Sequence, residues 1–146
     1  MTLSLVVPVY NDRAGVQSVV RQALELNIFH QIILSDDASD QPLCADDFAD
    51  ALSHEGLDLQ ILRSDQRQGA GAARNRALEQ VTGDYLLFFD SDDLLRPDLA
   101  VLWDKLQSQT DAFDFCIFHH AESREASGGM FPVSYTHLTL PTIYSV

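Results

Sequence analysis

The chain has 146 residues, 46% of them hydrophobic and 21% charged, which fits one soluble globular domain with a sizeable core. Its formal net charge of -13 disfavours nucleic acid and anionic membrane surfaces as partners, because their phosphates repel an acidic protein. We find no stretch apolar and long enough to span a membrane, and no signal peptide. Cys44 and Cys116 lie in no metal or redox motif, so we expect two reduced thiols, Cys116 in the core, and a cytoplasmic protein.

Short apolar runs alternate with helical patterns along the first 120 residues. The apolar runs predict strands at residues 3–7, 32–34, 57–62, 85–89 and 113–118. The helical spacing of apolar residues predicts helices over residues 16–24, 48–52, 69–81 and 97–106. This alternation predicts a Rossmann-like α/β fold, with a largely parallel sheet, right-handed crossovers and helices on both faces.

The first strand is followed by residues that end it and begin a helix. Pro8 has no amide proton to donate, so regular strand pairing should stop about there. Asn11 or Asp12 can then cap the helix whose apolar face starts at Val16.

Three carboxylates follow the strand at residues 85–89, which is aromatic-rich, not alternating, and therefore expected to be buried on both faces. Asp90 and Asp92 are two residues apart, so in extended backbone they project to the same side and repel each other. A divalent cation would remove that repulsion, and hard oxygen ligands suit Mg²⁺ or Mn²⁺. The alternative is a solvated turn in which Asp92 or Asp93 caps the next helix.

A second acidic cluster, residues 36–40, follows the strand at residues 32–34. In a parallel sheet it lies at the same edge as Asp90, the edge where open α/β sheets bind ligands. A carboxylate there could accept hydrogen bonds from a nucleotide base or a ribose hydroxyl. Alternatively, Asp37 and Ser39 only shape an Asx-type turn.

A glycine-containing segment, residues 69–75, opens the third predicted helix. It is close to a GxGxxG motif, but Arg74 stands where the third glycine belongs and the preceding loop is long, so a dinucleotide site is not expected. The start of the helix favours anions, and Arg74 could reach a phosphate. The alternative is a salt bridge between Arg74 and a neighbouring aspartate.

The end of the chain differs in composition from the rest. Residues 126–146 contain no Asp, Glu, Lys or Arg, and residues 134–142 resemble translated adaptor sequence found at the ends of unrelated predicted proteins. We therefore expect residues 1–124 to belong to the domain and residues 125–146 to be a non-native or disordered tail. The natural protein would then continue differently after about Phe131.

Four ordered motifs together resemble the signatures of family 2 glycosyltransferases with the GT-A fold. They are residues 6–11, 36–40, 69–75 and 89–93. The resemblance covers residues 1 to about 120, the nucleotide-binding part of that domain. It implies transfer of a sugar from a nucleotide-sugar donor, most often a UDP-sugar, with inversion at the anomeric carbon.

The resemblance also implies the donor site. Pro8, Tyr10 and Asp37 would frame the nucleotide base, with Asp37 hydrogen-bonding it, and Arg74 would lie against the base or the diphosphate.

In the same family, the motif at Asp90 and Asp92 holds a metal. Asp90 would contact the ribose or the water shell of the metal, and Asp92 would coordinate the Mg²⁺ or Mn²⁺ that bridges the diphosphate. The metal and Arg74 would stabilise the charge on the leaving diphosphate.

The family's general base lies in a later acidic motif that the chain does not contain before Val146. We therefore expect a donor-binding half without catalysis of its own, from a protein at the cytoplasmic face of the membrane or in the cytoplasm. The acceptor, saccharide or lipid-linked or other, stays open. Two alternatives are a non-catalytic nucleotide-binding module and a metal-dependent nucleotidyltransferase, although the latter's glycine-rich, basic loop is missing after the first strand.

Overall fold

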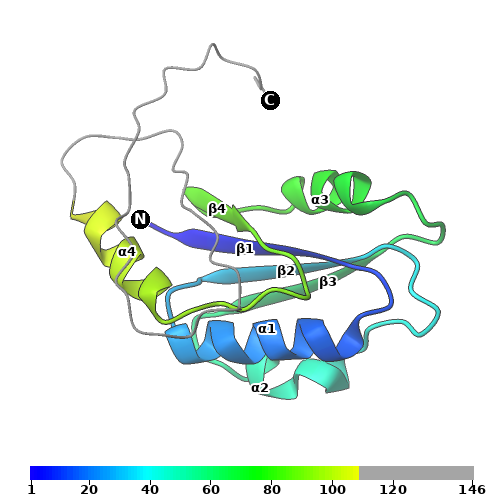
Figure 1. Ribbon diagram of the computed structural model, residues 1–146, viewed down its shortest axis with the longest axis horizontal. Helices are drawn as coiled ribbons and strands as arrows, with labels where there is room; N and C mark the ends of the chain where they lie inside the picture. The colour runs from blue at the N-terminus through cyan, green and yellow to red at the C-terminus, as the bar shows by residue number, and fades with distance from the viewer. Residues whose placement is uncertain (109–146) are drawn as a thin grey trace, which may run out of the picture. The chain divides into compact units, whose positions relative to one another are not determined.

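Four parallel strands in the order β3-β2-β1-β4 form the centre of the fold (Figure 1). This computed structural model describes residues 1–108. Its elements in chain order are β1 (Leu3–Val9), α1 (Arg13–Leu26), β2 (Gln31–Asp36), the 3₁₀ helix η1 (Ala45–Phe48), α2 (Ala49–Leu52), β3 (Asp58–Arg63), α3 (Ala70–Leu78), β4 (Tyr85–Phe88) and α4 (Asp98–Gln107).

Helices cover both faces of the sheet, as the alternating pattern predicts. Figure 1 shows α1 and α2 on one face and α3 on the other. The apolar stripe of α1 is buried at Val16, Val19, Val20 and Ala23. Since α3 faces the sheet with small residues, Ala73 and Ala77, it can approach closely. The structure confirms the predicted parallel α/β architecture.

The centre of the sheet is β1, all of whose residues are buried. Pairing of β1 with β2 continues one residue beyond Pro8, to Val9, which agrees with the expectation that regular pairing stops about Pro8. The pairing of β1 with β4 stops at Val6, which accepts the amide of Phe89 at 3.0 Å. Alternate residues of a strand bond to opposite neighbours, so Pro8, like Val6, faces the β4 side. The backbone nitrogen of Pro8 therefore faces a position beyond the end of β4, where this strand requires no amide donor.

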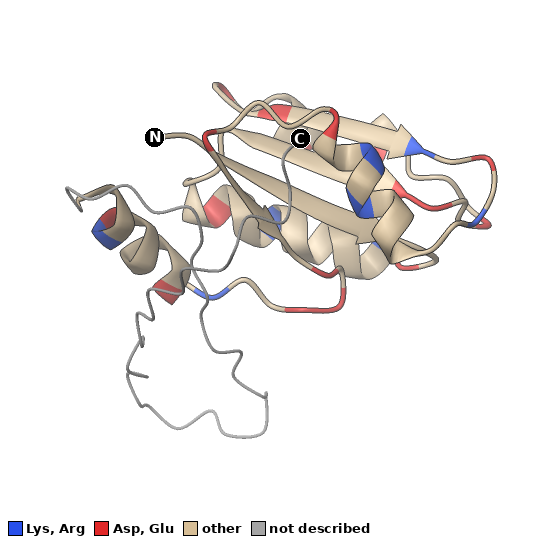
Figure 2. Ribbon diagram, turned by 90° about the horizontal axis from the view of Figure 1, so that it is seen from above, with Lys and Arg blue, Asp and Glu red and all other residues tan. Residues whose placement is uncertain are grey.

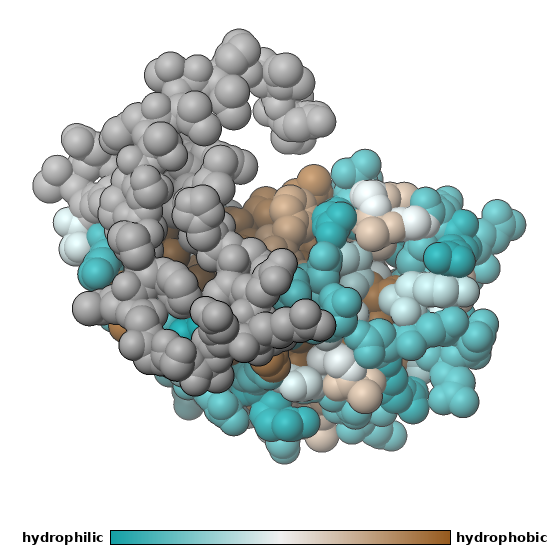
Figure 3. Space-filling model, in the orientation of Figure 1, coloured by the Kyte–Doolittle hydropathy of each residue, from teal (hydrophilic) through white to brown (hydrophobic). Residues whose placement is uncertain are grey.

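The predicted burial of the fourth strand on both faces is wrong. In the part of the chain that the structure describes, β4 is an edge strand; Tyr85, Leu86 and Leu87 are half-buried and Phe88 is 40% exposed. Figure 3 shows hydrophobic residues gathered on this side of the molecule, between α3 and β4. The fifth strand predicted at residues 113–118, Cys116 and the tail all lie outside the described residues.

Two helices differ in detail from the expectation. The pattern at residues 48–52 becomes the 3₁₀ helix η1 and the short α2, in which Phe48 and Ala51 are buried but Leu52 is 49% exposed. The third helix ends at Leu78, three residues before the predicted end, Val81. Within residues 1–108 we find no helix with the length and hydropathy of a membrane span.

A buried carboxylate holds the end of β2. Asp36 is fully buried and accepts hydrogen bonds from Arg63 of β3 at 2.5 Å and from the amide of Ser39 at 2.9 Å. Arg63 also donates to the carbonyl of Ser39 at 3.0 Å. Burial alone would raise the pKa of Asp36, but the hydrogen bonds from Ser39 and Arg63 outweigh burial and hold the pKa below the ordinary 3.8. The ionised carboxylate therefore fixes the loop after β2.

We predict that Asp36→Asn lowers the free energy of unfolding by about 1–2 kcal/mol at pH 7, a value reduced by the partial exposure of Arg63. Because folding lowers the pKa of Asp36, its contribution is present above pH 3.8 and is lost as the pH falls through the folded-state value. Urea unfolding of both proteins from pH 7 to pH 3 measures the difference. A difference that stays constant over this range contradicts the role assigned to the ionised form.

Candidate functional site

A cavity of about 550 Å³ opens at the carboxyl ends of the strands. Residues 8–12, at the end of β1 and directly after it, line one side, and residues 90–92 after β4 line another. Asp37, Arg67 and the start of α3 complete the wall. Segments far apart in sequence therefore meet at one edge of the parallel sheet, where ligands bind in open α/β folds.

All the site residues named from the sequence line this one cavity. They are Pro8, Tyr10, Asp37, Arg74, Asp90 and Asp92. The two acidic clusters also meet at one edge, as expected for parallel strands. The role of each residue in binding stays a prediction.

The segment after β1 is held by the loop after β2. Asn11 has a positive φ of 50° and donates its backbone amide to the hydroxyl of Ser39 at 2.9 Å. Its side-chain oxygen accepts the amide of Asp40 at 2.8 Å. Of the two predicted caps, Asp12 is the one that begins α1, because its carboxylate accepts the amide of Gly15 at 3.1 Å. These contacts fix Tyr10 at the rim of the cavity.

Asp37 holds the loop before α3. Its carboxylate is almost fully buried and accepts the backbone amides of Gln68, at 3.0 and 3.1 Å, and of Gly69, at 2.6 Å. Arg76 of α3 lies 3.5 Å from the same carboxylate. The Asx-turn alternative does not describe these contacts, since they run to a segment about 30 residues away. Asp37 therefore shapes the wall that it lines.

Arg67 was not singled out by the sequence. Its guanidinium lies 4.1 Å from the centre of the Tyr10 ring, a cation–π arrangement at the cavity wall. Arg67 sits in a polar loop, and no motif marked it, because this contact depends on the distance between two loops in space.

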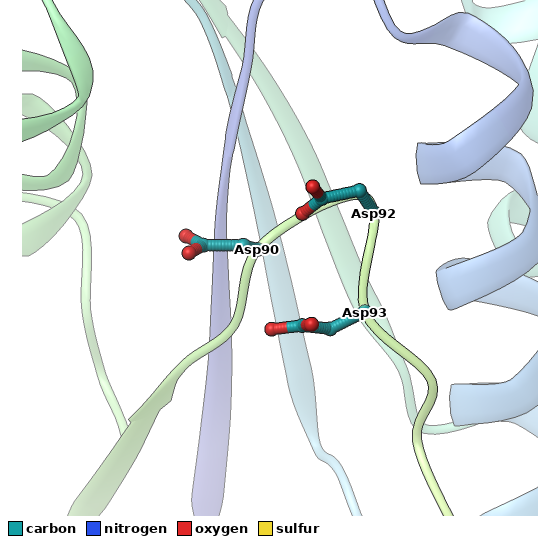
Figure 4. Close-up of side chains that lie close together, drawn as sticks. All are labelled: Asp90, Asp92 and Asp93. Atoms are coloured by element: carbon teal, nitrogen blue, oxygen red, sulfur yellow. The ribbon is translucent and has the colours of Figure 1, made fainter. Parts of the chain in front are cut away.

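The acidic segment after β4 is a turn, so the expectation of extended backbone is wrong. The amide of Asp93 donates to the carbonyl of Asp90 at 3.2 Å. One carboxylate oxygen from each of Asp90, Asp92 and Asp93 nevertheless lies within 4.8 Å of the others. Figure 4 shows all three carboxylates projecting to the same side of the loop, away from α1. The capping alternative for Asp92 and Asp93 is also wrong, because α4 begins at Asp98, after Pro97.

Arg74 and Asp90 form an ion pair across the cavity. The guanidinium Nη2 of Arg74 lies 2.5 Å from Oδ1 of Asp90, and both side chains are partly exposed. The structure thus shows the salt bridge to a neighbouring aspartate that the sequence analysis gave as the alternative for Arg74. The pair brings the guanidinium of Arg74 next to the acidic turn. One carboxylate oxygen of Asp90 also belongs to the convergent carboxylate group.

The charges that line the cavity fit a divalent cation. Four aspartates and two arginines line it, and acidic stretches are visible in the loops after the strands (Figure 2). The acidic turn offers hard carboxylate oxygens at close range, the donor type that Mg²⁺ and Mn²⁺ prefer. Asp90, Asp92 and Asp93 are therefore able to hold such an ion.

Comparison with known proteins extends this description. The family model described as glycosyl transferase family 2 matches residues 4–132. One similar protein is the teichuronic acid biosynthesis glycosyltransferase TuaG of Bacillus subtilis (strain 168). It is 31% identical to this chain over 118 residues. The match covers 77% of this chain and 45% of that protein, so the chain spans less than half the length of this relative.

Solved structures of glycosyltransferases are also similar. S. aureus TarS 1-349 in complex with UDP-GlcNAc is 25% identical, with a TM-score of 0.54, over 73% of this chain and 32% of that chain. Glucosyl-3-phosphoglycerate synthase from Mycobacterium tuberculosis, in complex with Mn²⁺, UDP and its product, is 28% identical, with a TM-score of 0.50, over 70% of this chain and 37% of that chain. These likenesses, with the parallel sheet, confirm the GT-A fold.

We predict that Asp37→Ala lowers the free energy of unfolding by about 2 kcal/mol, because it removes a charged acceptor of two backbone amides. Urea unfolding measures the change. Asp65→Ala, at an exposed carboxylate of the same loop, should change stability by less than about 0.5 kcal/mol. Equal effects of the two substitutions would contradict the role of Asp37 in holding this loop.

Proposed function

Because this chain belongs to glycosyl transferase family 2, we propose that it forms the donor-binding part of an enzyme that transfers a sugar from a nucleotide-sugar, with UDP as the nucleotide. The observation that carries the proposal is the single cavity lined by Pro8, Tyr10, Asp37, Arg74, Asp90 and Asp92. A sugar transferase is favoured over a nucleotidyltransferase or a non-catalytic module by the relatives, which are named as glycosyltransferases.

The nucleoside would bind between the segments after β1 and β2. The Tyr10 ring offers an apolar surface at the rim, where it is 39% exposed. Asp37 would accept a hydrogen bond from the base with lone pairs that its contacts to Gln68 and Gly69 leave available. UDP as the nucleotide is supported by the UDP and UDP-GlcNAc in the similar solved structures.

The diphosphate would bind between α3 and the acidic turn. Asp92, with Asp90, would hold Mg²⁺ or Mn²⁺, and the similar M. tuberculosis synthase is described with Mn²⁺. When bound, the ion would neutralise charge on the leaving diphosphate. Arg74, which is paired with Asp90, would donate to a phosphate oxygen from the other side. Transfer with inversion is part of the proposal and follows from the family resemblance alone.

The remaining expectations concern the whole protein. The acceptor and the general base stay unassigned, and the cytoplasmic location stays a prediction. The domain boundary expected at residue 124 also stays a prediction, and the family match runs past it to residue 132.

We predict that the chain binds UDP more tightly in Mn²⁺ than in a chelator, by about tenfold, and that Asp92→Asn removes most of this difference because it deletes a ligand charge. Isothermal titration calorimetry with UDP, with and without metal, measures both. Asp46→Asn, at an exposed carboxylate of η1 outside the cavity, should keep the full metal effect. If UDP bound the wild-type chain equally well in metal and in chelator, the metal assignment would be wrong.

We further predict that the 146-residue chain binds a UDP-sugar without transferring its sugar, because the general base is expected in a later motif. Product analysis by mass spectrometry after incubation with donor, Mn²⁺ and candidate acceptors tests this. Transfer that disappeared in Asp92→Asn would place the base within the chain and refute the donor-only assignment.

A further inference from the structure

The acidic turn, residues 90–93, is tied to the start of α1 by a hydrogen bond between the side chains of Ser91 and Asp12. The hydroxyl of Ser91 donates to Oδ2 of Asp12 at 2.7 Å. The other oxygen of Asp12, Oδ1, accepts the amide of Gly15 at 3.1 Å and so caps α1. One carboxylate therefore joins a rigid helix to the residue that lies between the two expected metal ligands, Asp90 and Asp92.

Gly15 allows this contact. A Cβ built on Gly15 would lie 2.1 Å from Oδ2 of Asp12 and 2.5 Å from the backbone carbonyl of Ser91. Both distances are far below van der Waals contact, and the second one involves backbone that can move only with the turn. The helix and the turn approach each other closely at this point because residue 15 has no side chain.

The helix that anchors the turn is itself fixed. It buries four apolar residues, Val16 among them, and its capping carbonyl, on Asp12, accepts the amide of Val16 at 3.1 Å. A second contact, from the amide of Leu95 to the side chain of Gln22 at 2.7 Å, ties the chain beyond the turn to the same helix. By contrast, Asp90 and Asp92 are exposed and rely on the turn for their position.

Asp12 itself is not placed as a ligand. Each of its oxygens accepts a hydrogen bond, and the convergent group found among residues 1–108 consists of Asp90, Asp92 and Asp93. Residues that orient metal ligands without touching the metal often set its affinity, and changing them costs about 10–100-fold. The position of Asp12 matches that role.

We propose that Asp12, Ser91 and Gly15 are positioning residues that fix the acidic turn on α1 and thereby set the affinity of the site for the divalent cation that binds with the donor. This proposal rests on the proposed function of the cavity. In this proposal, the metal affinity depends on the hydrogen bond between Ser91 and Asp12 and on the close approach of α1 to the turn at Gly15. It does not depend on the charge of Asp12.

Ser91→Ala should weaken Mn²⁺ binding by about tenfold, measured by calorimetry at fixed UDP, and leave UDP affinity in chelator unchanged. Ser53→Ala, which removes an exposed hydroxyl from the end of α2, should leave both affinities unchanged. Gly15→Ala should also weaken Mn²⁺ binding, although alanine is the better helix former. The double variant Ser91→Ala/Gly15→Ala should lose less than the product of the single losses, because both act on one turn.

Variants of Asp12 separate positioning from charge. Asp12→Ala should weaken Mn²⁺ binding about as much as Ser91→Ala. Asp12→Asn should retain most of the affinity, because its carbonyl can accept from Gly15 and its amide can donate to Ser91. If Asp12→Asn were as weak as Asp12→Ala while Ser91→Ala bound Mn²⁺ normally, charge would be the cause and the proposal would fall.

Hydrogen exchange without UDP or metal gives a readout that does not depend on donor binding. The amides of residues 90–95 should exchange faster in Ser91→Ala than in the wild type, and those of β1 and β2 should not change. Unchanged exchange at residues 90–95 would overturn the proposal that Asp12, Ser91 and Gly15 fix the acidic turn on α1. Faster exchange, with no metal effect on UDP binding in the wild-type chain, would instead refute the proposed function.

Discussion

The unequal parallel pairing of β1 with its two neighbours is the constraint on which the cavity depends. On one side β2 stays paired with β1 to Val9, and the amide of Asp37 then continues this ladder to Val9 at 2.8 Å. On the other side, the pairing of β1 with β4 ends at Val6. Among residues 1–108, no strand lies beside Pro8 on the shorter side, and the acidic turn and the start of α3 line the space beyond. Proline is tolerated there because no partner needs its amide.

The acidic residues around this edge divide into two kinds. Asp36 and Asp37 are buried, and their oxygens contact backbone amides of the surrounding loops and arginines of β3 and α3. Asp90 and Asp92 are exposed and line the cavity, and one oxygen of each lies within 4.8 Å of the other and of an oxygen of Asp93. A buried carboxylate needs hydrogen-bond partners, which the surrounding chain supplies here, so the first kind builds the wall. The second kind remains available to a cation.

The sequence predicted the layers, the four described strands and six of the residues that line the cavity. These features depend on local patterns, namely apolar runs and the placement of polar residues directly after them. It did not predict that β4 pairs with β1 only as far as Val6 or that Phe88 is exposed, because both depend on where β4 ends. It also missed Arg67 and Ser91, whose partners, Tyr10 and Asp12, are distant in the chain.

The balance of charge explains why a cation would be central to the proposed donor site. Four carboxylates line the cavity against two guanidinium groups, and one of these, Arg74, is already paired with Asp90. The chain as a whole carries a formal charge of -13. A diphosphate entering this field would meet net repulsion, and a single arginine could not compensate it. A divalent ion on the acidic turn would cancel this excess of negative charge, and the carboxylates that repel the donor would then hold its counter-ion.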